Sequence, residues 1–188
     1  MRPLKEDFFD NLGIGIEAEK EQIKNWLEHH RIRYYHITDD LIINVNGGVD
    51  LSGYKEEYLP DFIQFGEVLG YFDISYCKNL KSLKGCPKIS KNGFYCGYCD
   101  NLKNLEYAPE VCAGGFNCNY CENLISLKGC PKLVNSYFQC VGCKKLKSLK
   151  FGPSIVNGKF NCRKCGKQFK VEDVIKICPK INLEFVTL

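Results

Sequence analysis

The sequence predicts an α/β repeat solenoid in which a unit of about 22 residues is stacked several times, with a parallel β-sheet on its concave face. Two columns of residues carry this prediction. Phenylalanine recurs every 22 residues, at Phe72, Phe94, Phe116, Phe138 and Phe160. Cysteine recurs with the same spacing, at Cys77, Cys99, Cys121, Cys143 and Cys165. Because both columns stay in register over five copies, each copy is expected to form one turn of the stack.

Each unit begins with a strand pattern. In Phe94-x-Cys96 the two side chains are two residues apart, so both point to the same side of a strand and the residue between them points outward. The following Cys-x-x-Leu-x-x-Leu segment brings the chain round, and a proline turns it back. The prolines are Pro87, Pro109, Pro131 and Pro153, and an aliphatic residue stands two places after each, at Ile89, Val111, Leu133 and Ile155. No single unit can bury its apolar face, so the stability of each is expected to come from its neighbours.

The N-terminal residues 1–48 are expected to form a tail and a helical cap. Residues 16–30 place apolar side chains on one face at helical spacing, and Trp26 is expected to close the first end of the solenoid. Phe8 and Phe9 are interpreted as a staple onto the cap, the alternative being a short linear motif. The histidines are interpreted as surface or capping residues rather than metal ligands; they are His29, His30 and His36.

Residues 49–70 are interpreted as an irregular first repeat. Ile43 and Val45 alternate with polar residues, a turn follows at Asn46-Gly47-Gly48, and Val49 and Leu51 alternate again. Val49 precedes Phe72 by 23 residues rather than 22. Terminal repeats of solenoids are expected to be irregular because they cover an otherwise exposed core.

Residues 71–170 carry the regular units, and residues 171–188 are expected to form a C-terminal cap in the same continuous folded unit. Val171, Val174 and Cys178 have helical spacing, with acidic residues near the start, which predicts a short helix that ends before Pro179. Alternation at Ile181, Leu183 and Phe185 then predicts a last strand.

The composition favours a soluble protein in a reducing compartment. Of the 188 residues 45% are apolar, no apolar run reaches the roughly 18 residues that span a bilayer, and nothing at the N-terminus indicates secretion. The 13 cysteines are therefore expected to be reduced, in a cytoplasm, and no membrane association is expected. The pattern does not fix the oligomeric state.

The net charge of +4 conceals two halves of opposite sign. Residues 1–70 carry 7 Lys+Arg and 14 Asp+Glu, whereas residues 71–188 carry 19 and 8. A basic solenoid favours acidic partners. However, Arg163 is the one arginine among those 19 cations, and nucleic-acid readers rely heavily on arginine. The lysines are therefore interpreted mainly as solubilising side chains.

The repeats resemble leucine-rich repeats. Phe72-x-Ile74-x-x-Cys77 and Phe94-x-Cys96-x-x-Cys99 are similar to the L-x-L-x-x-N/C core of that family, over about residues 41–185. Within the family the chain most resembles small repeat proteins encoded by tailed bacteriophages, through Asp40–Ser52 and the Leu-Lys-Gly-Cys-Pro-Lys turn. The resemblance implies the repeat fold and a host-cell cytoplasm, but no activity.

Four C-x-x-C pairs follow one another at an interval of 18 residues, a spacing typical of zinc sites. If zinc binds, the first ligands are expected to be Cys96, Cys99, Cys118 and Cys121. Against zinc, Ile74 replaces the leading cysteine in the first copy, and the Phe and Leu columns of the same register need no metal. We therefore interpret the cysteines as reduced core residues and expect no cofactor.

The outward strand positions are the candidate binding face, because concave sheets of solenoids commonly bind partners. Tyrosines and amide side chains gather there, and tyrosine is enriched at the energetic centres of interfaces. The candidate residues are Asp73, Tyr76, Tyr95, Tyr98, Asn117, Asn119, Tyr120, Gln139, Asn161 and Arg163. The sequence shows no phosphate-binding loop, catalytic triad or HExxH motif. It thus favours a non-enzymatic module that binds a protein, the alternative being a zinc-stabilised, Lys-rich protein that binds nucleic acid.

Overall fold

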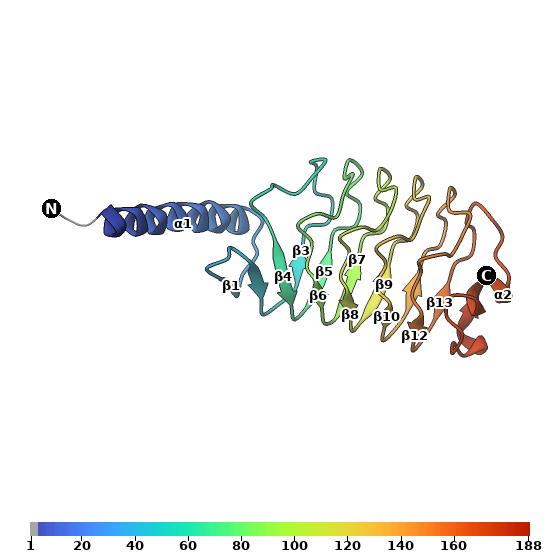
Figure 1. The fold of residues 1–188 in the computed structure, drawn as a ribbon. Coiled ribbons are helices and arrows are strands. Elements are labelled where there is room, and N and C mark those ends of the chain that lie inside the picture. Colours follow the sequence, from blue (N-terminus) through green and yellow to red (C-terminus); the bar gives the residue numbers. More distant parts are fainter. Residues whose placement is uncertain (1–3) are drawn as a thin grey trace.

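The computed structural model describes the backbone of residues 4–188 and the side chains of residues 15–188. The chain forms a parallel-strand β-solenoid of about seven turns, each of roughly 22 residues, which confirms the repeat predicted from the columns (Figure 1). The structure differs from the predicted α/β repeat because it has a second sheet and few helices. Each regular turn contributes two short strands, which build two seven-stranded sheets, and no helix lies within a regular turn.

The first sheet has the strand order β1-β2-β4-β6-β8-β10-β12. Its strands are β1 (Tyr35–Ile37), β2 (Ile43–Val45), β4 (Phe65–Val68), β6 (Ile89–Ser90), β8 (Val111–Cys112), β10 (Leu133–Val134) and β12 (Ile155–Val156). β1 pairs antiparallel with β2, and all later pairs are parallel. The aliphatic column after the prolines thus forms strands, but its side chains face outward: Val111 is 42% exposed.

The second sheet has the order β14-β13-β11-β9-β7-β5-β3. Its strands are β3 (Val49–Asp50), β5 (Tyr71–Asp73), β7 (Gly93–Tyr95), β9 (Gly115–Asn117), β11 (Phe138–Gln139), β13 (Phe160–Asn161) and β14 (Val186–Thr187). Val49 pairs with Phe72, so the expected offset of 23 residues at the first turn is confirmed. β2 and β3 belong to different sheets, and the turn between them carries the chain from one sheet to the other.

The core is a stack of phenylalanine rings. The column that begins at Phe72 is in register from strand to strand, and all its rings are buried. Centroids of successive rings are 5.7, 5.5, 5.8 and 5.0 Å apart. Burial of each ring stabilises the fold by roughly 2–3 kcal/mol. Because each ring is covered by the rings above and below it, this stabilisation depends on the stack being intact.

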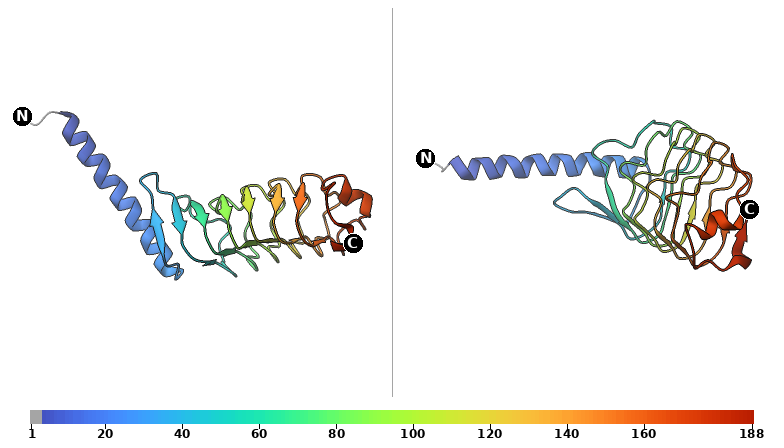
Figure 2. Two further views of the ribbon diagram at one scale, coloured as in Figure 1. Left: turned by 90° about the horizontal axis from the view of Figure 1, so that it is seen from below. Right: turned by 45° about the vertical axis from the view of Figure 1, so that its right-hand side comes forward.

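The helix α1 (Leu4–His29) begins well before the predicted start at residue 16. It projects from the first end of the solenoid in every view (Figures 1 and 2). Near its C-terminus Ile23 and Leu27 are buried in the core, and Trp26 packs against Phe65 with centroids 6.5 Å apart. The side chains of Phe8 and Phe9 lie outside the described residues, so their expected role stays a prediction.

The C-terminal segment differs in part from the prediction. The helix α2 (Val171–Ile175) lies where the spacing predicts one. The expected strand over Ile181–Phe185 is wrong: Leu183–Phe185 form a 3-10 turn, η1, and the strand begins at Val186. Leu183 and Phe185 lie in a tight turn instead, and Asn182 Oδ1 caps it by accepting the Glu184 amide hydrogen bond at 3.1 Å. Within the described chain, no helix has the length and apolar character needed to cross a membrane.

Candidate functional site: a tyrosine-bearing sheet face

Three tyrosines form a stacked row beside the second sheet. Tyr76, Tyr98 and Tyr120 follow β5, β7 and β9 in the turns. Their ring centroids are 4.7 and 4.9 Å apart and the rings are nearly parallel, at 7° and 21°. Tyr76 is 56% exposed and Tyr98 is 39% exposed, while Tyr120 is half-buried. We call these three residues the tyrosine ladder. It is a rigid aromatic surface open to solvent.

All three tyrosines of the ladder have a left-handed backbone, with φ of +61°, +58° and +56°. This conformation costs a residue with a side chain roughly 1–2 kcal/mol. In the same column Gly53 and Gly142 also have positive φ, of +70° and +71°. Glycine adopts this conformation without strain, so the ladder places large rings at turns where glycine is the easier residue.

A second group of tyrosines, Tyr71, Tyr95 and Tyr137, lies on or next to strands of the second sheet. Tyr71 and Tyr95 stack with centroids 6.3 Å apart. The Tyr137 ring lies on Gly115, where a β-carbon would be 2.3 Å from Tyr137 Cζ. Burial and the neighbouring Tyr95 hydroxyl raise the pKa of Tyr137 to about 12. Sequence reasoning did not select Tyr71 or Tyr137, although a column of Tyr, Gly, Gly and Tyr at 22-residue spacing signalled that glycines make room for rings.

The predicted polar residues of this face serve the turns themselves. Asp73 Oδ1 accepts a hydrogen bond from the Ser75 amide at 2.8 Å, and Asn117 Oδ1 accepts one from the Asn119 amide at 2.9 Å. Asn161 Oδ1 accepts one from the Arg163 amide at 3.4 Å. In each case a side-chain oxygen caps the backbone two residues later, which fixes the turn that follows the strand.

Two further amide side chains on this face bind each other across adjacent turns. Asn119 Nδ2 donates to Gln139 Oε1 at 3.0 Å, and Asn119 Oδ1 accepts from the Val141 amide at 2.7 Å. The strand register brings five predicted residues side by side; they are Asp73, Tyr95, Asn117, Gln139 and Asn161. The strand pairing therefore brings these predicted residues together on one face. Many of the polar side chains, however, form hydrogen bonds within or between the turns. The tyrosines remain the best candidates for contact with a partner.

Nine of the 13 cysteines form two columns along the solenoid, one for each position of the C-x-x-C pairs. Twelve of the 13 are buried, and Cys165 is half-buried. The second cysteine of each C-x-x-C pair donates to the backbone carbonyl at the first position of the pair one turn earlier. Cys121 Sγ donates to the Cys96 oxygen at 3.1 Å, and Cys99 Sγ donates to the Ile74 oxygen at 3.1 Å. Since the acceptor is a backbone atom, Ile74 fills this position as well as a cysteine does.

The four predicted zinc ligands, Cys96, Cys99, Cys118 and Cys121, are all buried thiols. Zinc binds the thiolate, whereas burial raises the pKa of Cys96 well above its ordinary value. Among the described residues, no group of three or more His, Cys, Asp or Glu side chains is arranged to hold a metal ion.

Cys165 differs from the other thiols. The thiols of Cys140 and Cys143 and the Gly142 amide hold its pKa below its ordinary value. Partial burial opposes this effect. The Cys165 thiol donates to the Cys140 carbonyl oxygen at 3.0 Å. Half-buried and at the end of its column, it is the most accessible cysteine.

Several exposed lysines of the solenoid form ion pairs with an acidic residue one turn earlier. Lys84 lies 2.7 Å from Asp61, Lys128 lies 2.6 Å from Glu106, and Lys144 lies 2.6 Å from Glu122. All three pairs are well exposed, so each contributes little to stability. They nevertheless neutralise part of the positive charge of residues 71–188.

Comparison with known proteins adds no relative. No family model matches the chain, and no similar curated protein or solved structure was found.

Proposed function

We propose that the protein is a non-enzymatic interaction module that binds another protein through the tyrosine-bearing face of its second sheet. The exposed tyrosine ladder is the observation that carries this proposal. Stacked rings offer a large surface that is already ordered, so binding costs little conformational entropy. The apolar faces with phenolic hydroxyls at their rims suit a partner that presents both apolar and hydrogen-bonding groups.

The backbone of the ladder supports the proposal. Stacking recovers part of the cost of left-handed φ, since an aromatic pair contributes about 0.5–1.5 kcal/mol beyond its buried area. Tyr76 nevertheless remains 56% exposed, so much of its surface is not used inside the described chain. A strained, exposed aromatic row is typical of a surface that serves binding as well as folding.

The finer assignments belong to the same proposal. The L-x-L-x-x-C likeness of Phe94–Cys99 supports kinship with leucine-rich repeats, with the tyrosine face as the concave one. The ends of α1 and of the segment after Val171 act as caps because they cover the first and last turns. If the chain comes from a bacteriophage, as the resemblance implies, its partner is a host or defence factor in the bacterial cytoplasm.

The test is affinity capture from bacterial lysate at low and high salt. Wild type is compared with a variant in which the ladder is truncated, Tyr76→Ala/Tyr98→Ala/Tyr120→Ala. The control truncates three exposed aromatics outside both tyrosine groups, Tyr58→Ala/Tyr107→Ala/Phe151→Ala. All three proteins are first checked for equal helicity and cooperative unfolding.

The expected result is a protein that wild type and the control variant retain at high salt and the ladder variant does not. Equal retention by all three proteins would rule out the tyrosine ladder as the binding surface. Recovery of nucleic acid alone, released from all three by salt, would instead favour the Lys-rich surface, because binding to phosphates falls steeply with salt.

A further inference from the structure

A small pocket opens between the last regular turn and α2. Its volume is about 250 Å³, and its walls are residues 147–150 on one side and Lys167 with residues of the α2 region on the other. Charged side chains dominate the lining. They are Lys147, Lys150, Lys167, Lys176 and Asp173. None of the lining residues belongs to either group of tyrosines.

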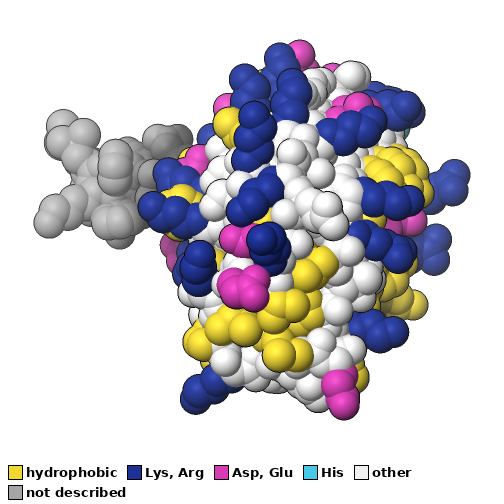
Figure 3. Space-filling view, turned by 90° about the vertical axis from the view of Figure 1, so that its right-hand side faces the viewer, with side chains coloured by type: hydrophobic (Ala, Val, Ile, Leu, Met, Phe, Trp, Pro, Cys, Tyr) yellow, Lys and Arg dark blue, Asp and Glu magenta, His cyan; other side chains and the backbone are white. Residues whose placement is uncertain are grey.

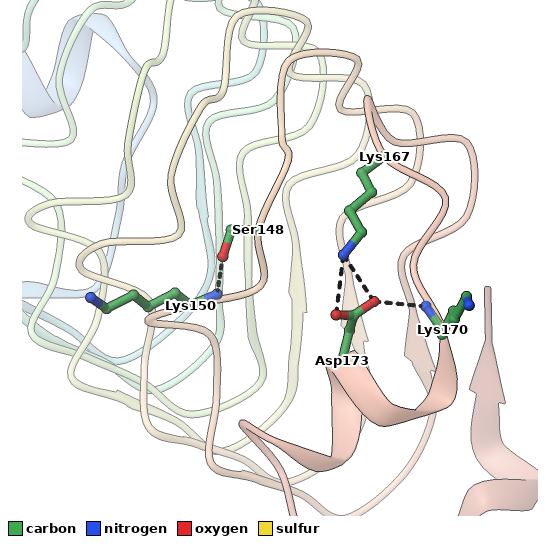
Figure 4. Close-up of polar contacts among 5 residues, drawn as sticks. All are labelled: Ser148, Lys150, Lys167, Lys170 and Asp173. Carbon is green, nitrogen blue, oxygen red and sulfur yellow. Dashed lines mark hydrogen bonds and ion pairs between the residues drawn. The ribbon is translucent and has the colours of Figure 1, made fainter.

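The single carboxylate of the pocket is already engaged. Lys167 Nζ lies 3.2 and 3.3 Å from the two oxygens of Asp173, and the Lys170 amide donates to Asp173 Oδ2 at 3.0 Å (Figure 4). The Lys170 amide and the nearby lysines hold the pKa of Asp173 below its ordinary value, so it stays ionised. Within the described chain, Lys147, Lys150 and Lys176 pair with no carboxylate, and the lining is left with an excess of positive charge.

The sequence of this turn departs from the charge pattern of the turns before it. At the position of Lys150, the earlier copies have Lys84, Glu106 and Lys128, and the two lysines each pair with an acid one turn earlier. Lys150 follows Lys128 instead, so two like charges stand on adjacent turns. Like charges in neighbouring ladder positions are destabilising unless a counter-charge is supplied.

The excess charge is concentrated at this end of the molecule. Residues 144–180 contain 11 Lys+Arg and 2 Asp+Glu, which accounts for most of the positive charge of residues 71–188. Viewed from the C-terminal end, lysine and arginine side chains surround the face and acidic side chains are few (Figure 3). The potential of this end therefore attracts anions.

We propose that this pocket binds a compact phosphate-bearing anion, such as a pyrophosphate or triphosphate group. Lysine ammonium groups bind phosphate as point charges. Ser148 Oγ accepts the Lys150 amide hydrogen at 3.1 Å, which leaves the hydroxyl hydrogen to donate to a phosphate oxygen. Pockets for drug-sized organic ligands have volumes of roughly 300–1,000 Å³. A volume of about 250 Å³ therefore suits a phosphate chain better than a whole nucleotide.

One side chain has to move for this role. Lys150 Nζ lies over the Phe151 ring, 4.9 Å from its centroid, and points away from Asp173 (Figure 4). Rotation about its flexible side-chain bonds brings the ammonium to the pocket. Exposed cation–π contacts are weak, so a phosphate competes with the ring effectively.

The phosphate group has two sources, a soluble polyphosphate compound or the backbone of a nucleic acid. The experiment therefore measures binding of sodium tripolyphosphate and, separately, of a single-stranded oligothymidine, by calorimetry at one fixed ionic strength. The pocket variant is Lys147→Gln/Lys150→Gln/Lys176→Gln. The matched control, Lys78→Gln/Lys103→Gln/Lys132→Gln, removes three exposed lysines elsewhere and the same net charge.

Wild type and the control variant are expected to bind tripolyphosphate with equal affinity within about twofold, and the pocket variant about tenfold more weakly, since three weak ionic contacts are lost. In wild type, amide chemical shifts are expected to move at residues 147–150 and 173–177. The shift map keeps the test valid if the pocket variant does not fold.

Equal weakening in both variants, or shifts spread over the lysines of all turns, would show general charge attraction and overturn the proposal. So would the absence of tripolyphosphate binding combined with oligothymidine binding that both variants lose equally. Oligothymidine binding lost only by the pocket variant would support the site and identify nucleic acid as the source of the phosphate.

Discussion

The ring of Tyr120 lies directly on Gly142, the residue one turn later in the same column. A β-carbon at position 142 would stand 2.4 Å from Tyr120 Cδ1, well inside contact distance. Gly142 also has φ of +71°, which is unfavourable for any side chain. The tyrosine ladder therefore ends at Gly142 because the last ring occupies the space where the next side chain would begin.

This contact predicts a coupled effect of two substitutions. Gly142→Ala is expected to destabilise the protein by about 1–3 kcal/mol, since alanine brings both backbone strain and a clash with the Tyr120 ring. In a Tyr120→Ala background the same change should cost less, because only the backbone strain remains. Urea unfolding of the four proteins measures the coupling, and strictly additive free energies would contradict the contact.

The left-handed backbone of Tyr98 predicts an unusual preference for glycine. Tyr98→Gly is expected to be more stable than Tyr98→Ala by up to about 1 kcal/mol, because both lose the stacking but only glycine relieves the φ of +58°. Tyr95, within strand β7, serves as the control, and there alanine should be the more stable choice. Thermal unfolding of the four variants compares the stability of the glycine and alanine variants at each position. If the same residue were the more stable choice at both positions, backbone strain at Tyr98 would be excluded.

Cys96 and Cys121, one from each cysteine column, are expected to respond differently to serine. At Cys121→Ser the hydroxyl can take over the hydrogen bond to the Cys96 carbonyl, which the thiol donates at 3.1 Å. Cys96 Sγ donates no hydrogen bond within the described residues, and only burial and neighbouring thiols raise its pKa. Cys96→Ser should therefore cost about 1–3 kcal/mol more than Cys121→Ser, the penalty of an unsatisfied buried hydroxyl. Equal unfolding midpoints in urea would refute the assigned hydrogen bond.

The carboxylates that hydrogen-bond to lysines or to a backbone amide predict that the protein loses stability in acid. The pKa of Asp173 is lowered by the Lys170 amide and Lys167, and that of Glu122 is lowered by Lys144. A carboxyl whose pKa is lower in the folded state stabilises the fold above its unfolded pKa, and this contribution disappears as the pH falls through the folded value. The urea midpoint should therefore fall between neutral pH and pH 3. The fall should be smaller in Asp173→Asn; an unchanged pH profile in that variant would contradict the role of Asp173.

Part of the fold could be predicted because stacked turns repeat the same residue types at a fixed spacing in the sequence. Phe72 and Phe94 occupy the same position in successive turns, so the spacing of the residues gives the length of a turn directly. The inward strand positions followed in the same way from the period of two in Phe94-x-Cys96. The first sheet was missed because strands such as Ile89–Ser90 are two residues long, too short to show any period.

The candidate site was predicted less completely. The residues that point outward could be predicted from the repeat. Whether each of their side chains is free to contact a partner or hydrogen-bonds within the protein could not. Asp73 and Asn117 were expected to meet a partner, and they cap their own turns. That distinction depends on side-chain rotamers and on contacts between turns, which residue types alone do not specify.

The sequence by itself determined the length of the turn, the register of the core columns and the burial of phenylalanine and cysteine, because each of these is repeated in every copy. Only the tertiary structure decided what occurs once. It placed α1 as a projection from the first end, stacked three tyrosines with the last ring against Gly142, and brought Lys147 and Lys176 to one pocket. These features arise from contacts between turns and at the ends of the stack. They are not repeated from turn to turn, so no pattern in the sequence indicates them.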